Sequence, residues 1–420
     1  MKIFYAKYIL PVTSEVIEDG AVVIEGRKIV DFGKREEIEF KFKDVARREI
    51  DLKNALIMPG FVNAHTHLEL SDFKIEKVND FKEWLWEIVL RKDKKYAPKW
   101  YDEFNFIVSF LERRWLRKIY RALQEIITSG TIAIGDVTNT GELVTRLVSL
   151  PLRVHIFVEL IAFSDEKALQ VFEKLKSNLN DITAVIERHN YQNKFRLSFS
   201  AHAPYSVSER LFKLIKDFNG ERKTSVHLAE PIEEIEFIKH GTGFFRDFLT
   251  KRGSFNSGWQ PPGKSPVKYL DDIGFLDENT LAVHCVNVDD EDIQILSSRN
   301  VSVCTCPRSN FFLKVGKAPL RKFLDNGINV CLGTDSKASN NDLNILNELR
   351  FAREYYRDVS DEELIKIATI NGAKALGFDM IGSIEKGKDA DLIYFTIPKD
   401  LKKSEIYEFI FSSSLCGRLI

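Results

Sequence analysis

The 420-residue sequence predicts an α/β fold: a (β/α)8 TIM-like barrel with a small β-sandwich domain built from both chain ends. Both ends consist of short strand-like segments separated by turns, whereas the middle holds eight buried apolar runs. Amphipathic helical patterns lie between most of these runs. Eight parallel strands with intervening helices over roughly 300 residues fit a closed barrel better than an open sheet.

The small domain is expected from residues 1–56 together with residues 380–420. The first part reads as KIFYAKYIL, a turn at Glu18-Asp19-Gly20, AVVIEG, KIVDFG and REIDLKNALIM, and the last part returns to strands and turns in GSIEKGKDADLIYF. Residues 57–379 then form the barrel.

Eight runs predict the barrel strands, separated by helical patterns such as EWLWEIVL and ERLFKLIKDF. They are FVNAHTH, IAIGDV (132–137), LRVHIFVEL (152–160), FRLSFSAHA (195–203), TSVHLAE (224–230), TLAVHCV (280–286), VSVCTC (301–306) and INVCLGTD (328–335). The irregular stretch 250–268 lies where barrels carry their functional loops, and we expect a mobile active-site loop there.

The composition excludes several classes of protein. Lysine plus arginine total 61 against 62 acidic residues, a net charge of −1 that gives no reason to bind nucleic acid or membrane surfaces. Without a long apolar span or a signal-peptide pattern, the chain is expected to be cytoplasmic. The five cysteines show no CxxC spacing and are expected to be buried reduced thiols.

Five of the eight histidines fall at or near the C-terminal ends of predicted strands, where such barrels place their chemistry. These five are His65, His67, His202, His227 and His284. The others are expected to be structural, with His155 inside a strand and His189 and His240 in helix or loop contexts.

A metal site is predicted from four strand-end residues. Alternate side chains of a strand share a face, so His65 and His67 both point into the barrel mouth. His227 and Asp335 add a third imidazole and a carboxylate, which completes a catalytic zinc-type ligand set with room for a water. Asp335 can instead cap the helix expected after it.

Two further residues are candidates for proton transfer. Glu230 lies three residues after His227 and is well placed to move protons beside a metal, or it simply begins the next helix. His284 ends the sixth strand and either holds the attacking water or is a hydrogen-bonded core histidine.

The segments MPGFVNAHTHLEL, VHLAE, AVHC, CTCPRSN, GTDSKASNN and GSIEKGKDADLIYF resemble the amidohydrolase superfamily over essentially the whole chain. Within it, the chain is similar to the cytosine-deaminase-like branch, which holds chlorohydrolases, guanine deaminases and deaminases of adenosine, S-adenosylhomocysteine and aminodeoxyfutalosine. The fourth strand ends in Ser200-Ala201-His202, without the lysine that bridges two metals in binuclear branches.

The resemblance implies one metal ion, zinc first with iron or manganese as alternatives, on His65, His67, His227 and Asp335. It also implies that Glu230 is the proton shuttle, and that His284 and Asp335 position and deprotonate the water. Such a site converts a ring amine into a carbonyl and releases ammonia.

Three residues bear on the substrate. His202 matches a position that family members use to contact substrate, and Trp84 either stacks on a flat heterocycle or belongs to the core. Arg308 is suited to a substrate carboxylate or to a surface ion pair. Glu87 and Asp93 can hold ribose hydroxyls, but the match does not assign them.

The expected function is hydrolytic deamination of the 6-amino group of an adenine nucleoside. Because Arg308 favours an acidic substrate, the first candidate is 6-aminodeoxyfutalosine, an intermediate of menaquinone biosynthesis. Alternatives are deamination of S-adenosylhomocysteine, methylthioadenosine or adenosine, and a guanine deaminase or chlorohydrolase of the same branch. A non-catalytic scaffold is more remote because every expected ligand is present, and a homodimer is left open.

Overall fold

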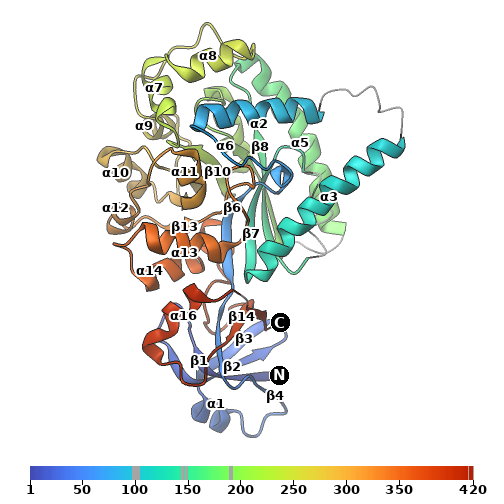
Figure 1. Cartoon of the computed structure of the whole chain (residues 1–420), viewed down its shortest axis with the longest axis vertical. Helices are drawn as coiled ribbons and strands as arrows, with labels where there is room; N and C mark the ends of the chain where they lie inside the picture. Colours follow the sequence, from blue (N-terminus) through green and yellow to red (C-terminus); the bar gives the residue numbers. More distant parts are fainter. Residues whose placement is uncertain are drawn as a thin grey trace.

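The computed structural model describes residues 1–96, 105–141, 143, 147, 150–188, 193–414 and 416–419. The predicted fold class is confirmed, because an eight-stranded parallel sheet forms a barrel and a second sheet from the two chain ends lies below it in Figure 1. Both termini lie in the second sheet (Figure 1). No helix within these residues is long and apolar enough to span a bilayer.

The barrel strands coincide with the eight predicted runs. They are β6 (Phe61–Thr66), β7 (Thr131–Thr138), β8 (Arg153–Leu160), β9 (Phe195–Ala201), β10 (Thr224–Leu228), β11 (Thr280–His284), β12 (Ser302–Thr305) and β13 (Val330–Leu332), paired in chain order. The backbone N–H groups of Thr334 and Asp335 both donate to the carbonyl of His65, which joins the last strand to the first. Nearly every strand residue is buried, as expected for a parallel sheet covered by helices.

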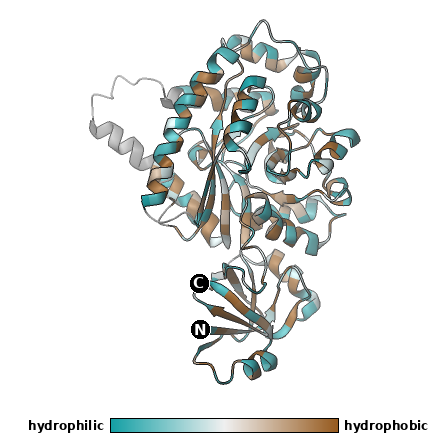
Figure 2. Cartoon of the chain, turned by 180° about the vertical axis from the view of Figure 1, so that it is seen from behind, coloured by the Kyte–Doolittle hydropathy of each residue, from teal (hydrophilic) through white to brown (hydrophobic). Residues whose placement is uncertain are grey.

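Helices surround the barrel, and their apolar faces turn toward the strands (Figure 2). They are α2 (Phe81–Tyr96), α3 (Asn105–Thr128), α5 (Asp165–Arg188), α6 (Glu209–Asn219), α7 (Ile232–His240), α8 (Phe244–Lys251), α9 (Pro266–Asp272), α10 (Asp290–Ser298), α11 (Pro307–Leu313), α12 (Leu320–Asp325), α13 (Ile345–Tyr355), α14 (Asp361–Ile367) and α15 (Ile370–Ala375). Sequence signals fix several starts, since Ser208 caps α6 and capping boxes at Asp289 and Ser360 begin α10 and α14.

The small domain is one continuous sheet in the order β15-β14-β5-β1-β2-β3, with β4 paired to β1. Its elements are β1 (Lys2–Ile9), β2 (Ile17–Glu25), β3 (Lys28–Lys34), β4 (Arg48–Asp51), β5 (Ala55–Pro59), β14 (Leu392–Thr396), β15 (Gly417–Arg418), α1 (Arg35–Lys41) and α16 (Ile406–Ser412). Separate apolar clusters cover its two faces. The predicted boundary at residue 57 falls inside β5, which belongs to this sheet as far as Pro59.

The stretch 250–268, expected to be a mobile active-site loop, makes aromatic contacts with neighbouring elements. Its ends belong to α8 and α9, and the ring of Trp259 stacks on Phe237 of α7 at 4.7 Å between centroids. Phe255 packs nearby against Phe163. Two aromatic side chains of this stretch, Phe255 and Trp259, thus pack against Phe163 and Phe237, and its mobility stays a prediction.

The remaining histidines and the cysteines can be placed as well. His155 is buried, with its two ring nitrogens 3.0 Å from the Leu376 carbonyl and 2.8 Å from the Ser198 hydroxyl. His240 is exposed in the last turn of α7, and His189 lies outside the described residues. All cysteines are free, and all except the half-buried Cys416 are buried.

Close packing between β6 and β7 depends on Gly135. A Cβ at this position would clash with the carbonyl oxygen of Ala64 and lie 2.8 Å from the side chain of Leu376. We expect G135A to lower the free energy of unfolding by about 1–3 kcal/mol, measured by urea denaturation. G258A is the control, because the nearest atom to its new Cβ is 3.4 Å away; an equal effect of both substitutions would contradict this packing.

Candidate functional site

Three imidazoles converge at the C-terminal mouth of the barrel. The Nε2 atom of His67 lies 3.2 Å from that of His65 and 3.4 Å from that of His227, and His65 and His227 are 3.3 Å apart. Nitrogens at 2.0–2.1 Å from a tetrahedral zinc ion are about 3.3–3.4 Å from one another. The triangle therefore has the size that a single divalent metal requires.

Burial keeps His65 and His67 in their neutral form. It lowers the pKa of His67 to about 4 and the pKa of His65 well below its usual range. Neutral imidazole is the metal-binding form. Nδ1 of His227 is 2.8 Å from the carbonyl of His202 and donates to it, which leaves the lone pair on Nε2 facing the centre of the triangle.

Asp335 completes the group from the end of β13. Its Oδ2 accepts hydrogen bonds from the hydroxyls of Ser309 and Ser339, both at 2.7 Å. Its Oδ1 lies 3.8 Å from Nε2 of His65 and 3.7 Å from Nε2 of His67. One oxygen is thus held by serines while the other faces the imidazoles. The residue does not cap a helix, because α13 begins at Ile345 and Asn344 is its cap.

Glu230 and His284 face each other beside this group. Oε1 of Glu230 is 3.5 Å from Nε2 of His284. Nδ1 of His284 donates to Oδ1 of Asn310 at 2.8 Å, so Nε2 is free to accept a proton. Burial, with Asp335 and Glu234 adding to it, holds the pKa of Glu230 well above its usual range. Glu230 precedes α7, whose first residue is Ile232.

Left-handed backbone at two strand ends turns these side chains toward the mouth. Ala229 has φ 50°, His284 has φ 73° and Cys285 has φ 46°. Non-glycine residues rarely adopt this region, and the strain is tolerated when surrounding contacts fix it. Here the N–H groups of Val286 and Asn287 both donate to the carbonyl of Ala229.

Glu234, which the sequence did not single out, holds the turn that carries Glu230. Its carboxyl oxygens accept the backbone N–H of Ala229 at 3.0 Å and of Glu230 at 3.2 Å. The side chain is fully buried, and burial raises its pKa to about 8. In the sequence, Glu234 looks like an ordinary acidic residue in the first turn of a helix. Its contact with the turn is therefore seen only in the folded structure.

Of the residues expected to contact substrate, His202 lies at the histidine cluster, whereas Trp84 packs in an apolar cluster. His202 lies beside the imidazoles, with its ring centroid 5.2 Å from that of His227. Trp84 donates from Nε1 to the carbonyl of Ala338 at 3.0 Å and packs against an apolar cluster, as a core residue does. Glu87 pairs with Arg91 within α2.

Arg308 already has carboxylate partners. Its guanidinium makes a bidentate pair with Asp342 at 2.9 and 3.2 Å, and a further carboxylate, Glu348, lies 3.9 Å away. It also lines a cavity of about 530 Å³ together with Lys77 and Lys314. The ion-pair alternative therefore describes its contacts in the structure. Asp93 is likewise paired, with Arg252.

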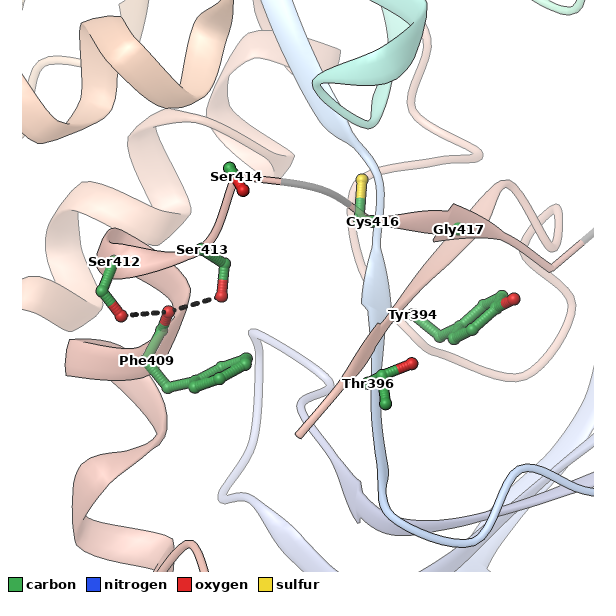
Figure 3. A pocket seen from close by; sticks show the side chains of 8 residues that line it. All are labelled: Tyr394, Thr396, Phe409, Ser412, Ser413, Ser414, Cys416 and Gly417. Atoms are coloured by element: carbon green, nitrogen blue, oxygen red, sulfur yellow. Dashed lines mark hydrogen bonds between the residues drawn. The ribbon is translucent and has the colours of Figure 1, made fainter. Parts of the chain in front are cut away.

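Another cavity, of about 480 Å³, belongs to the small domain and contains none of the strand-end histidines. Figure 3 shows its lining of Tyr394, Thr396, Phe409, Ser412, Ser413, Ser414, Cys416 and Gly417. The hydroxyls of Ser412 and Ser413 both donate to the carbonyl of Phe409 (Figure 3). These two hydroxyls are thus engaged by the helix backbone.

The raised pKa of Glu234 predicts a pH-dependent stability. Its pKa of about 8 in the fold exceeds the ordinary value near 4.3, so the folded state binds the extra proton and stability falls as pH rises toward 8. Between pH 6 and pH 9 this loss is about 2–3 kcal/mol. In urea titrations at both pH values, we expect E234Q to lack this part of the decline.

The control for that measurement is E236Q, which removes an exposed carboxylate from the same helix. It should decline as the wild type does. An identical decline for E234Q and wild type would show that Glu234 does not titrate in this way.

Comparison with known proteins places the chain in a family. The model of the amidohydrolase family matches residues 56–414. The 5-methylthioadenosine/S-adenosylhomocysteine deaminase of Pyrococcus abyssi is 30% identical over 396 residues, which cover 92% of this chain and 82% of that protein. The 5′-deoxyadenosine deaminase of Methanopyrus kandleri is 30% identical over 403 residues, covering 91% and 83%.

A solved structure of a deaminase is also similar to the whole chain. Helicobacter pylori aminofutalosine deaminase in complex with methylthio-coformycin superposes with a TM-score of 0.83 at 27% identity, covering 100% of both chains. Since the family model spans most of the chain and includes every strand of the barrel, the resemblance seen in the sequence is confirmed. The chain belongs to the amidohydrolase family and is a metal-dependent hydrolase that acts on C–N bonds.

Proposed function

We propose that the protein is a zinc-dependent aminohydrolase that removes the 6-amino group of an adenine nucleoside. The observation that carries this proposal is the triangle of Nε2 atoms with edges of 3.2–3.4 Å, with Asp335 on one side and a buried Glu230 close by. In this proposal His65, His67, His227 and Asp335 are the metal ligands. The relatives that match most of the chain are named as deaminases of adenine nucleosides.

The donor set favours zinc over harder cations. Three imidazole nitrogens and one carboxylate oxygen suit zinc, whereas magnesium and calcium take mainly oxygen ligands. Iron and manganese bind the same ligand types, so the metal itself needs measurement. A zinc ion held there supplies a water of lowered pKa as the nucleophile for attack on C6 at neutral pH.

The protein residues then handle the protons. Burial raises the pKa of Glu230, which favours the protonated carboxyl that donates to the ring nitrogen beside C6 and makes that carbon electrophilic. Nε2 of His284, whose Nδ1 is fixed by Asn310, accepts the proton that the attacking water releases. Glu230, now ionised, takes the proton held by His284, 3.5 Å away, and passes it to the departing amine. The remaining hydroxyl proton on C6 then returns to Glu230 as the carbonyl forms. The overall reaction consumes one water and yields the 6-oxo nucleoside and ammonia.

The candidate adenine nucleosides fall into two classes that differ in their 5′ substituent. The first candidate remains 6-aminodeoxyfutalosine, supported by the match to an aminofutalosine deaminase over the whole chain. Methylthioadenosine and S-adenosylhomocysteine are the second, because relatives at 30% identity carry that name. The bidentate pair of Arg308 with Asp342 weakens the earlier argument for an acidic substrate. The cytoplasmic location stays a prediction.

Replacement of Glu230 tests the chemistry. We expect E230Q to retain about one metal ion per chain but to lose at least 10²–10⁴-fold in kcat, because the amide cannot carry the proton. Metal content by plasma emission spectrometry and ammonia release are the two measurements. H227A is the paired variant and should lose both metal and activity. Near-normal turnover of E230Q, or wild-type protein without a transition metal, contradicts the proposal.

A substrate screen separates the two classes. Ammonia release from 6-aminodeoxyfutalosine, S-adenosylhomocysteine, methylthioadenosine and adenosine should give one kcat/KM at least tenfold above the rest. R308M then tests the arginine: if it contacts a substrate carboxylate, it reduces kcat/KM for the acidic substrates about 10–100-fold more than for methylthioadenosine. Equal loss on acidic and neutral substrates assigns Arg308 to structure alone.

A further inference from the structure

Glu159 is a buried carboxylate at the barrel mouth that the proposed chemistry does not use. It stands near the C-terminal end of β8 and is only 4% exposed. Its Oε2 accepts a hydrogen bond from the side-chain amide of Asn139 at 2.8 Å. Its Oε1 has no hydrogen-bond partner among the described residues. A buried polar atom without a partner is costly, which points to a ligand that supplies the donor.

The unpartnered oxygen lies beside the histidine cluster. Oε1 is 3.8 Å from Nδ1 of His227, and ligand atoms of Glu159, His202 and His227 all lie within 4.8 Å of one another. The Nδ1 proton of His227 is already donated to the carbonyl of His202. This nitrogen therefore neither serves Glu159 nor binds a second metal.

A fixed network holds the carboxylate in this orientation. The side-chain oxygen of Asn139 accepts from the ammonium of Lys92 at 2.9 Å, so its NH₂ group must face Glu159. The backbone N–H of Asn139 donates to the buried Glu69. Asn139 is thus held through its side-chain oxygen, its side-chain NH₂ and its backbone N–H, and Glu159 presents Oε1 as a preorganised acceptor.

In the strand order, β8, which carries this acceptor, lies two strands from β10 and three strands from β11, whose ends carry Glu230 and His284. In the closed order of eight strands, β7 and β8 face β11 and β12, and His284 ends β11. A purine whose C6 edge meets Glu230 and His284 extends its sugar away from β10 and β11, toward β6 and β7, and β8 adjoins β7. Lys92 already supplies a cation to the network through Asn139, so a neutral donor is the better match for Oε1.

We propose that Oε1 of Glu159 accepts a hydrogen bond from a ribose hydroxyl of the substrate and so makes the enzyme select ribonucleosides over deoxyribonucleosides. The inference rests on the proposed function. It assigns the carboxylate to the part that all candidate adenine nucleosides share, whichever 5′ substituent they carry.

The test compares a ribonucleoside with its 2′-deoxy and 3′-deoxy analogues. For the wild type, one of the two deoxy analogues should lose about 10–100-fold in kcat/KM, as expected for a hydrogen bond to a charged acceptor. In E159Q the new amide oxygen must face Asn139, which turns its NH₂ toward the sugar and removes the acceptor at nearly constant volume. E159Q should therefore accept ribose and deoxyribose forms within about threefold of each other.

E69Q is the matched control, because Glu69 is a buried carboxylate of the same network whose oxygens are already taken by Thr138 and Asn139. Whatever it does to kcat, it should keep the wild-type preference for ribose. Metal content and the urea midpoint are measured for each variant, and E159A repeats the test if E159Q does not fold.

The outcomes separate the two proposals. Wild-type turnover of adenine nucleosides without dependence on either hydroxyl overturns the role of Glu159 alone. The same holds if E159Q and E159A slow all three substrates by an equal factor. If the wild type deaminates no adenine nucleoside at all, the proposed function is wrong and this inference fails with it.

Discussion

Three imidazole nitrogens meet within 3.4 Å of one another in the buried mouth of the barrel, and they come from strands that lie 160 residues apart in sequence. Lone pairs pointed at one another repel unless a cation lies between them, so such a group persists only where the rest of the fold holds it. His65 lies in β6, His67 directly follows that strand, and His227 lies in β10. The surrounding contacts can be understood as what keeps these atoms in place.

Two features hold the site residues in place: left-handed turns of the backbone and buried polar side chains that hydrogen-bond to them. Left-handed residues after β10 and at the end of β11 turn the chain sharply, and the buried Glu234 accepts the two backbone N–H groups that the first turn exposes. Two serines hold one oxygen of Asp335, leaving the other for the imidazoles. Asn310 fixes the ring of His284. Each supporting group satisfies a polar atom that burial would otherwise leave unpaired.

Much of this could be predicted because the relevant signals are local. The eight apolar runs appear as β6 to β13, since fully buried parallel strands require continuous apolar residues. The polar residues that interrupt those runs at their C-terminal ends are the ones that converge, because all eight ends share one rim of the barrel. Glu159 carried the same signal at the end of FVEL and was not singled out.

The sequence by itself determined the fold class, the family and the strand-end residues that meet at the barrel mouth, because periodicity and the order of short motifs are written along the chain. Only the tertiary structure decided what each side chain contacts. Arg308 forms an ion pair with Asp342, and Trp84 packs against an apolar cluster. Glu234 accepts the backbone N–H of Ala229 in the turn after β10. Such contacts depend on which residues the fold places within about 3 to 4 Å of each other. When the two residues are far apart in the chain, the local sequence around either one does not indicate the contact.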